Sequence, residues 1–392
     1  MSDAQVRDMA MFDGRLEYTI FALVSASFAN IYITQPILPV LQREFSTDLV
    51  LVSFTVSAVI LGIAISNLPF GFLADRISIH PIIFIGGLMV AFGGLICAVS
   101  NDFWMFIGAR FLQGIFIPAL TTCLAAYLAK TLPVVRLNVV MGSYVSATVL
   151  GGLAGRLLGG WIPSPLNWRY AFGIASVLVL AATFTALRTL PPTFADAGHR
   201  QDSIGFFVLI KRWELLRIYG CAAGSFAIFS SIFNYLPFRL EAPPFNFSTE
   251  MTTSLYVVYV VGIFMGPISG KMCNRIGCGN TLIGGAVLLG ISLALVFRPS
   301  VAAVVAGLIG VCAGFFTIHA AAVGCLNRKL FIGQGRSNAL YVLFYYIGGW
   351  LGITGTGFAF KHGGWNAVIY ICLFLLLIPL GAGFGERKGS RR

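Results

Sequence analysis

Long apolar stretches alternate with short polar ones along nearly the whole chain. The stretch "VLLGISLALVF" (287–297) is typical, because it carries no charge and lacks the alternation of polar and apolar positions seen in strands of a membrane barrel. A helix needs roughly 20 residues to cross the hydrocarbon core of a bilayer. The pattern predicts twelve membrane-spanning helices, at about 18–40, 49–70, 81–99, 104–128, 138–162, 169–188, 217–238, 252–271, 280–297, 301–324, 337–360 and 366–384.

The composition agrees with a chain that is embedded in lipid. Of the 392 residues, 58% are hydrophobic and only 10% are charged, and the mean hydropathy is +0.88. One soluble core cannot bury this much apolar surface, so a water-soluble globular protein is excluded and the lipid bilayer is the expected surrounding. We therefore predict an all-α integral membrane protein.

Lysine and arginine are distributed unevenly between the two sides of the predicted spans. Basic residues gather in the cytoplasmic loops of membrane proteins. With the N-terminus inside, the basic residues on the opposite side are only Arg43, Arg169, Arg239, Arg298 and Lys361. Both termini are therefore predicted to be cytoplasmic, with the protein in a plasma membrane, the inner membrane of a bacterium. The net charge of +12 then belongs to the membrane surface, and we expect no nucleic-acid partner.

The chain contains an internal repeat. The segment "PFGFLADRIS" (69–78), after the second span, matches "ISGKMCNRIG" (268–277), after the eighth. The aligned pairs include Gly71 with Gly270, Asp75 with Asn274 and Arg76 with Arg275. Two six-helix halves therefore follow each other in the same orientation, and transporters built from such parallel repeats bind their substrate between the halves.

The repeat also predicts the division of the chain. We expect an N-terminal six-helix half at 1–190, a cytoplasmic linker at 191–216 and a C-terminal six-helix half at 217–392. The linker holds the polar stretch "LPPTFADAGHRQDS" and then "IGFFVLIKRW". We expect the second of these to lie in the membrane interface as an amphipathic helix.

The first copy of the repeated loop resembles a known motif. "GFLADRISIHP" (71–81) is similar to the loop motif of the major facilitator superfamily, Gly-x-Leu-Ala-Asp-Arg-x-Gly-Arg-Arg/Lys, although Ser78, Ile79 and His80 replace its later glycine and basic positions. The resemblance covers essentially the whole chain and implies the major facilitator fold, with two pseudo-symmetric halves. It implies that this loop locks the halves in the outward-facing state, whereas a tight turn with solvated charges is the alternative. The predicted switch residues are Gly71, Asp75, Arg76, Gly270 and Arg275.

Two further motifs extend the resemblance. "RFLQG" (110–114) is similar to the fourth-helix motif of proton-coupled members, with Arg110 in the place of the buried arginine of that family. "GGLAGRLLGG" (151–160) resembles the fifth-helix antiporter motif, with Arg156 in the place of its proline. Glycines four residues apart allow close helix approach, and in this motif they are expected to form a sliding contact between the halves. They are Gly151, Gly155, Gly159 and Gly160.

Arg110 and Arg156 are the charged residues within the predicted spans. At 1.5 Å per residue from Trp104 and Trp161, expected at the outer interface, both lie roughly 8–9 Å below it. A charge at this depth costs at least a few kcal/mol unless it faces protein, water or a partner. Two interpretations stay open: the arginines line a substrate cavity, or they reach the outer headgroups or bind carbonyl groups freed by the glycine-rich backbone.

No carboxylate is predicted within a span, since every Asp and Glu falls in a loop or a tail. Many drug exporters of the resembled family use such a carboxylate to bind cationic drugs and to carry the proton, so that chemistry is not expected here. His319 is the embedded side chain with an ordinary pKa near neutrality, and a proton relay and a packing role are both open for it. The other candidates for substrate binding or coupling are Tyr32, Gln35, Gln113, Asn234 and Tyr345.

The stretches "GFFTIHAAAVG" (314–324) and "ALYVLFYYIGGWLGITGTG" (339–357) look like the subgroup of sugar- and drug-efflux permeases, the drug:proton antiporter-like members of the family. This resemblance implies export without naming a cargo. Tyrosines in the second half provide ring faces and hydroxyls that suit an amphiphilic organic ligand. They are Tyr256, Tyr259, Tyr341, Tyr345 and Tyr346.

The sequence therefore predicts a secondary active transporter that exports a small organic solute by alternating access, with protons as the coupling ion. Embedded arginines without embedded acids favour an anionic or polar neutral cargo. The alternatives are a multidrug exporter of lipophilic compounds, an importer or uniporter of an organic anion, and a sensor or scaffold without transport. We expect no enzyme activity, because the sequence contains no His-Glu-x-x-His set, and an ion gradient as the driving force, because it contains no ATP-binding Gly-x-x-x-x-Gly-Lys loop. We also expect a monomer without cofactor or metal.

Overall fold

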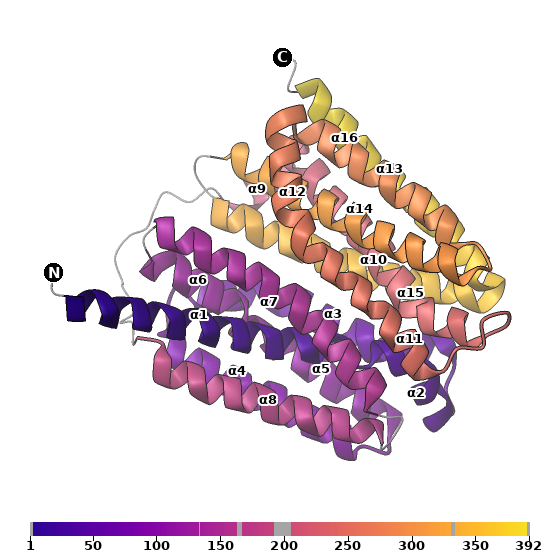
Figure 1. The fold of residues 1–392 in the computed structure, drawn as a ribbon, viewed down its shortest axis with the longest axis horizontal. Helices are drawn as coiled ribbons and strands as arrows, with labels where there is room; N and C mark the ends of the chain where they lie inside the picture. The colour runs from indigo at the N-terminus through magenta and orange to yellow at the C-terminus, as the bar shows by residue number, and fades with distance from the viewer. Residues whose placement is uncertain (1–2, 133, 163–166, 192–204, 331–333, 390–392) are drawn as a thin grey trace.

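The computed structural model describes residues 3–132, 134–162, 167–191, 205–330 and 334–389, and every regular element in these ranges is a helix (Figure 1). The helices before the linker are α1 (Asp3–Tyr32), α2 (Leu38–Glu44), α3 (Leu49–Leu73), α4 (Ile79–Val99), α5 (Phe103–Leu120), α6 (Thr122–Thr131), α7 (Val134–Trp161) and α8 (Trp168–Thr189), with the 3₁₀ helix η1 (Gln35–Ile37) between α1 and α2. The later helices are α9 (Phe206–Lys211), α10 (Trp213–Glu241), α11 (Thr249–Leu255), α12 (Val261–Ile276), α13 (Cys278–Val296), α14 (Val301–Arg328), α15 (Gln334–Leu375) and α16 (Leu377–Gly389), with η2 (Tyr256–Val260) between α11 and α12.

These helices confirm the predicted membrane-spanning fold. Ten helical segments in the described ranges are long and apolar enough to cross a membrane. The last of them, 335–388, contains two predicted spans, because its backbone leaves helical geometry at Gly364 (φ 61°, ψ −158°). Beyond this break the chain packs on α13, where Trp365 donates a hydrogen bond to the carbonyl oxygen of Val296 (3.3 Å). With the 28-residue α7, each predicted span corresponds to helical structure.

Three predicted spans are interrupted, which corrects the expectation of continuous helices. The first leaves α-helical geometry after Tyr32 and continues as η1 and α2, because Pro36 and Pro39 lack the N–H that a helical turn requires. The fourth divides at Thr121, shortly after Pro118, and the eighth tightens into η2. Each interruption frees carbonyl groups that other donors must satisfy inside a membrane.

The packing repeats between the two parts of the chain, as the internal repeat predicts. In the first half α7 packs on α1, while α4 packs on both α5 and α8. In the second half α15 packs on α10, while α13 packs on both α14 and α16. The first half ends with α8 at Thr189 and the second begins with α10 at Trp213 rather than at 217, and residues 192–204 of the expected linker lie outside the described ranges.

Close backbone contact between α1 and α7 explains most of the glycines in the fifth span. A Cβ atom on Gly155 would lie 2.1 Å from the carbonyl oxygen of Ala29 in α1, so no side chain fits there. One turn to either side, Gly151 approaches Ser25 of α1 and Gly159 approaches Ile33 just after α1, both about as closely. These three glycines therefore pack within the first half, and do not form the expected sliding contact between the halves.

Gly160 is the motif glycine that does face the second half. A Cβ atom on it would lie 1.8 Å from the hydroxyl oxygen of Thr253 in α11. The contact belongs to the seam, the surface along which the first half (up to Thr189) meets the second half (from Trp213). The α7 helix therefore packs closely on α1 along one face and on α11 at its end.

The halves are joined at the end of the molecule that holds α2 and α11, which we call the paired end; both chain termini lie at the opposite, terminal end (Figure 1). Among the interactions of the described residues, the hydrogen bonds that join the halves directly lie between the paired end and the level of Arg156 in α7. They are Arg43 with Glu241, Asp48 with Lys361, Ser53 with Asn234, and Arg156 with Tyr259.

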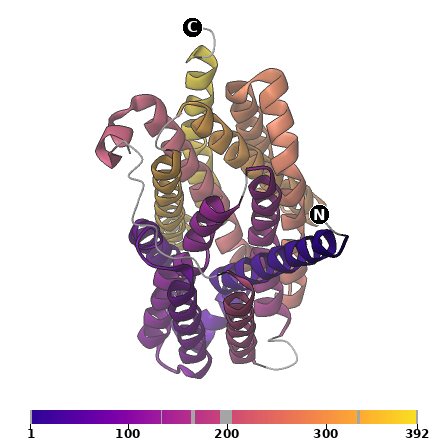
Figure 2. The same cartoon turned by 90° about the vertical axis from the view of Figure 1, so that its left-hand side faces the viewer.

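The linker helix α9 touches both halves near the terminal end, which faces the viewer in Figure 2. The ring of Phe206 packs edge-to-face on Phe72 at the end of α3, with centroids 5.7 Å apart. The guanidinium of Arg336, at the start of α15, lies 5.5 Å from the centroid of the same ring. On the outer side Phe207 and Trp213 are 82% and 68% exposed, which fits the predicted position in the membrane interface.

Candidate functional site

Arg156 lies at the seam and is 1% exposed. Its Nε donates a hydrogen bond to Gln35 Oε1, its Nη2 to the hydroxyl of Tyr259 and its Nη1 to the carbonyl oxygen of Gly152, each at 2.7 Å. Gln35 belongs to the first half and Tyr259 to the second. One buried side chain thus connects the two halves.

Aromatic rings surround the guanidinium of Arg156. Its Cζ lies 4.0 Å from the ring centroids of Tyr32 and Tyr259, and 5.5 Å from that of Tyr256. A desolvated cation against such rings is stabilised by about 2 kcal/mol. Among the described residues no ion pair includes Arg156, so neutral oxygens and rings alone compensate its charge.

Arg110 is fully buried inside the first half. It donates hydrogen bonds to the carbonyl oxygens of Asn30 (2.7 Å), Ile31 (2.7 Å) and Thr55 (2.8 Å), and to Gln113 Oε1 (2.6 Å). The first two oxygens end α1, where the broken helix leaves carbonyls without helical donors and where the helix dipole favours a cation. Arg110 therefore caps the interrupted first helix, and the α1 carbonyl groups that it binds lie at the break after Tyr32 and not in a glycine-rich stretch.

Gln113 extends this arrangement to a fourth helix. Its Nε2 donates hydrogen bonds to Asn30 Oδ1 (3.2 Å) and to the carbonyl oxygen of Val90 in α4 (3.1 Å). The structure does not bring Arg110 and Arg156 together. Instead, both bind the interrupted stretch of the first span, Arg110 through Asn30 and Arg156 through Gln35.

A column of rings runs from Arg156 into the second half. Tyr259 meets Phe229 edge-to-face (5.3 Å between centroids), Phe229 stacks on Phe315 (3.9 Å), and Phe315 stacks on His319 (6.0 Å). The predicted residue Tyr345 stacks on Phe226 at 3.8 Å and lies 5.2 Å from the His319 ring. The structure thus places Tyr345 and His319 in one aromatic cluster that ends at Arg156.

His319 is held by a tyrosine on the neighbouring helix. The hydroxyl of Tyr341 lies 2.9 Å from His319 Nδ1. His319 and Tyr345 are both partly exposed although they lie deep in their spans, and the phenol of Tyr345 is within electrostatic reach of Tyr32 in the first half. These two side chains are therefore less enclosed than Tyr341, which is buried.

Asn234 lies in the seam on α10, fully buried. Its amide donates a hydrogen bond to Ser53 Oγ of the first half (3.2 Å). Its Oδ1 has no partner among the described residues, and neither have the buried hydroxyls of Thr55 and Ser57 on α3. A buried polar atom without a partner costs about 1–3 kcal/mol, so these groups are available to a ligand or to water.

Acidic residues are absent from this site in the described part of the chain. The prediction that all acids lie in loops and tails is wrong for several glutamates, which lie within helices: Glu17, Glu44, Glu214, Glu241, Glu250 and Glu386. Among the described acids Glu386 in α16 is the buried one, at 8% exposure. It pairs with Arg217 (3.3 Å) and Lys329 (3.0 Å) near the terminal end of the second half. No cluster of His, Cys, Asp and Glu that could hold a metal occurs among the residues searched.

The two copies of the predicted switch loop have matching contacts. Asp75 Oδ1 accepts a hydrogen bond from Lys130 Nζ at the end of α6 (2.6 Å), and Asn274 Oδ1 accepts one from Arg328 at the end of α14 (2.5 Å). Asp75 and Arg76 are exposed, as are Gly270 and Arg275 in the second copy, while Gly71 is half-buried. Each loop is thus braced within its own half, at the terminal end.

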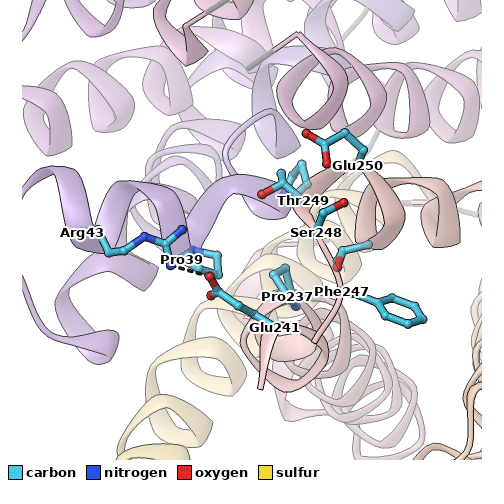
Figure 3. Close-up of a pocket in the computed structure, with 10 residues that line it drawn as sticks. Pro39, Arg43, Pro237, Glu241, Phe247, Ser248, Thr249 and Glu250 are labelled. Atoms are coloured by element: carbon cyan, nitrogen blue, oxygen red, sulfur yellow. Dashed lines mark hydrogen bonds and ion pairs between the residues drawn. The ribbon is translucent and has the colours of Figure 1, made fainter. Parts of the chain in front are cut away.

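The paired end contains a cavity of about 290 Å³ between the halves (Figure 3). Pro39 and Arg43 line it from the first half, and Pro237, Glu241 and Ser248 line it from the second. The ion pair between Arg43 and Glu241 lies at its edge. The cavity therefore marks where the halves meet at the paired end.

Asp48 combines two roles at this end. Its Oδ1 accepts the backbone N–H of Leu51 (2.8 Å) and so caps α3, while its Oδ2 accepts from Lys361 Nζ (2.9 Å) across the seam. The Leu51 N–H and then the Lys361 ammonium lower the pKa of Asp48 below its ordinary value. The carboxylate thus stays ionised, and the contact between the halves stays formed, into acidic solution.

Sequence reasoning did not single out several residues of the seam. Tyr259 appeared as one tyrosine among five, and Thr253, Ser53 and Asp48 did not appear as candidates. A residue's place at the seam depends on how α11 and α3 meet the other half, which no local pattern encodes. The one available signal was the glycine pair at 159 and 160, which marks close contact on two faces of α7.

Comparison with known proteins identifies the fold. The sequence profile of the "Major Facilitator Superfamily" matches residues 20–330. The solved structure of "A Bacterial Homolog to Human Lysosomal Transporter, Spinster, in Inward-facing And Unoccupied Conformation" superposes with a TM-score of 0.74 at 13% identity, covering 97% of each chain. At this identity the likeness is one of fold.

Three curated relatives match along nearly their whole length. "Uncharacterized MFS-type transporter YybF" of Bacillus subtilis is 26% identical over 371 residues, covering 93% of this chain and 92% of the relative. "Inner membrane transport protein YnfM" of Escherichia coli is 26% identical over 374 residues (94% and 89%). A "Chloramphenicol resistance protein" of Pseudomonas aeruginosa is 27% identical over 388 residues (95% and 90%).

Replacement of Arg110 by methionine is expected to destabilise the first half. The carbonyl oxygens of Asn30 and Ile31 lose their donor, at a cost of about 1–3 kcal/mol for each buried group. Thermal unfolding of the purified variant should show a clearly lower midpoint, and Arg110→Lys, which keeps a cation at the end of α1, should recover part of it. A midpoint equal to that of the wild type for Arg110→Met would contradict the capping role.

The contact between Asp48 and Lys361 should depend on pH in one direction. Because the pKa of Asp48 is lowered in the folded state, the pair stabilises fully above the ordinary Asp pKa of about 3.9 and is lost as the pH falls through the lowered value. Wild type and Lys361→Gln should differ in unfolding free energy by at most about 1 kcal/mol near pH 7, since both side chains are partly exposed. The difference should vanish near pH 2, and one that persists unchanged would show that the charges contribute nothing.

Proposed function

The chain belongs to the Major Facilitator Superfamily, and we propose that it exports a small organic solute in exchange for protons, working by alternating access. It is a multi-pass membrane transporter and not an enzyme. An anionic or polar neutral solute is the proposed cargo. The observation that carries this proposal is Arg156, a buried cation at the seam with no acidic partner among the described residues.

The arrangement of the halves supports alternating access. Direct hydrogen bonds join them from the paired end to the level of Arg156, and partly exposed rings lie below it toward the terminal end. We propose that both termini are cytoplasmic, by the distribution of basic residues, and that the membrane is a bacterial inner membrane, as the name of one relative states for that protein. The described conformation is then the inward-facing one, ready to take cargo from the cytoplasm.

A charge argument supports an anionic or polar neutral cargo. A cationic drug entering between the halves would meet Arg156 and no carboxylate, and like charges in a low-dielectric site repel each other. An anion would instead provide the missing counter-charge. The hydroxyls of Thr55 and Ser57 and the Oδ1 of Asn234, which lack partners among the described residues, offer further polar contacts to an uncharged solute.

His319 is the proposed site of proton coupling. It is partly exposed, and its Nδ1 lies against the hydroxyl of Tyr341, a partner that can either donate or accept a hydrogen bond. The ring column connects it to Arg156 at the seam. Protonation of His319 would therefore change the electrostatic potential at the residues that line the cargo site.

Export of lipophilic compounds is the second candidate. It is favoured by the aromatic cluster around Phe226, Phe229 and Phe315, which offers more ring surface than polar surface. One relative is named a chloramphenicol resistance protein. Import or uniport of an organic anion would use the same arginine but would not need a proton-binding group.

Transport in proteoliposomes with an imposed pH gradient distinguishes these functions. We expect anionic or neutral organic solutes to move against protons in wild-type vesicles, and Arg156→Gln to reduce this flux at least about tenfold, because charge-assisted hydrogen bonds to the cargo are lost. Arg169→Gln, at a half-buried arginine of the paired end that bonds to Glu44 of its own half, serves as the control. Uptake of lipophilic cations that Arg156→Gln leaves unchanged would establish the second candidate instead.

The proton role of His319 has its own test in the same vesicles. We expect His319→Gln to abolish the dependence of flux on the pH gradient while downhill exchange of cargo continues, because glutamine keeps hydrogen bonding but does not titrate. His362→Gln is the matched control, since His362 is exposed at the paired end and bonds only to Phe358 of its own helix among the described residues. A full pH response in His319→Gln would remove the relay.

A further inference from the structure

The hydrogen bonds of Arg156 have a geometry that suggests what its ligand is. Nε and Nη2 form the side edge of a guanidinium, where two N–H bonds point in parallel and match the two oxygens of a carboxylate. In this structure Gln35 Oε1 lies 2.7 Å from Nε and the Tyr259 hydroxyl oxygen lies 2.7 Å from Nη2. Two neutral oxygens, one from each half, thus occupy the positions of a bidentate carboxylate.

The surroundings of that edge indicate what the carboxylate is attached to. Tyr32 and Tyr259 lie against the guanidinium, and the ring column of Phe229 and Phe315 continues from Tyr259 toward His319. Aromatic pairs stack or meet edge-to-face with their centroids about 4.5–7 Å apart. A flat aromatic body attached to the carboxylate would add one more ring to this column.

We propose that the cargo is an aromatic carboxylate that binds Nε and Nη2 of Arg156 in place of Gln35 Oε1 and the Tyr259 hydroxyl, with its ring against the aromatic column. This inference rests on the proposed function, since it names the cargo of the same site. A bidentate pair of hydrogen bonds between a guanidinium and a carboxylate, in which both partners are charged, is stronger than the bonds from the same guanidinium to two neutral oxygens. The exchange therefore favours the bound state without leaving a donor of Arg156 unsatisfied.

The same exchange links binding to the seam. The bond from Arg156 to Tyr259 joins the first half to the second, so a carboxylate that takes its place removes a direct connection between the halves. Binding of the cargo thus removes one hydrogen bond between the halves at the level of its own site. Differential binding of this kind is what allows a ligand to shift a conformational equilibrium.

Binding to the purified, full-length protein tests the proposal without any transport. The probes are 1-naphthoate, its uncharged amide 1-naphthamide, and the cation 1-naphthylmethylammonium, in calorimetry and in thermal unfolding. We expect 1-naphthoate to bind and to raise the unfolding midpoint, while the amide and the cation bind at least about tenfold more weakly, because they cannot form the two charge-assisted bonds.

Substitution of Gln35 tests most directly whether the ligand binds in place of its Oε1. Gln35→Glu places a carboxylate of the protein itself on the edge of Arg156, so the variant should fold at least as stably and bind 1-naphthoate at least about tenfold more weakly. Gln42→Glu, on α2 at the paired end, makes the same change of charge and should bind like the wild type.

Substitution of Tyr259 tests the other half of the contact. Tyr259→Phe removes the hydroxyl that accepts from Nη2 of Arg156, so this variant should bind 1-naphthoate at least as tightly as the wild type. Tyr219→Phe is the control, because it also removes a buried tyrosine hydroxyl.

Specific results would overturn the inference. These are the absence of 1-naphthoate binding to the wild type, equal binding of the acid and the amide, or wild-type affinity in Gln35→Glu. Failure of the inference and failure of the proposed function are distinguishable. Proton-driven flux of other solutes without 1-naphthoate binding overturns only the aromatic carboxylate, whereas binding without any flux in vesicles overturns the transport proposal.

Discussion

A guanidinium inside a membrane protein must find acceptors for its N–H donors, and most of this structure around the seam follows from that requirement. Arg110 and Arg156 are both buried, and no described acid pairs with either. The interrupted first span supplies the oxygens instead: the end of α1 accepts from Arg110, and Gln35 of η1 accepts from Arg156. The prolines interrupt the helix and so leave polar oxygens without helical donors, and the arginines bring N–H donors that have no acidic acceptor. Each group therefore satisfies the hydrogen bonds of the other.

The internal repeat makes the placement of Arg156 informative. Close contact of α7 with α1 through Gly151 and Gly155 has its counterpart in α15 and α10, where Gly348 and Gly352 lie against the backbone of α10. The residue after Gly155 is Arg156, whereas the residue after Gly352 is Ile353, whose carbonyl oxygen accepts from Tyr235 of its own half. At equivalent positions of the same helix packing, the first half thus has a cation and the second half has an apolar side chain. Shared architecture explains the glycines, whereas it does not explain the arginine that follows Gly155 in the first half alone.

The sequence was sufficient for the fold because lipid imposes strong local constraints. Apolar runs of about 20 residues predict spans, and the repeated loops at Asp75 and Asn274 predict two matching halves. The site was predictable only in part. Arg156 was conspicuous because a charge in an apolar run needs an explanation, but its partners depend on the break after Tyr32 and on the approach of α11. Nothing local separates Tyr259, which bonds to Arg156, from Tyr370, which faces outward at 62% exposure.

The contacts at the paired end differ in how firmly they hold. Arg43 with Glu241 and Asp48 with Lys361 are partly exposed, so water replaces their hydrogen bonds readily when they separate. Arg156 is different, because withdrawing the ring and hydroxyl of Tyr259 leaves a desolvated charge until another group arrives. The desolvation cost of separating the halves is therefore larger at Arg156 than at the exposed ion pairs. An acceptor that reaches the guanidinium of Arg156 as Tyr259 leaves it lowers that cost.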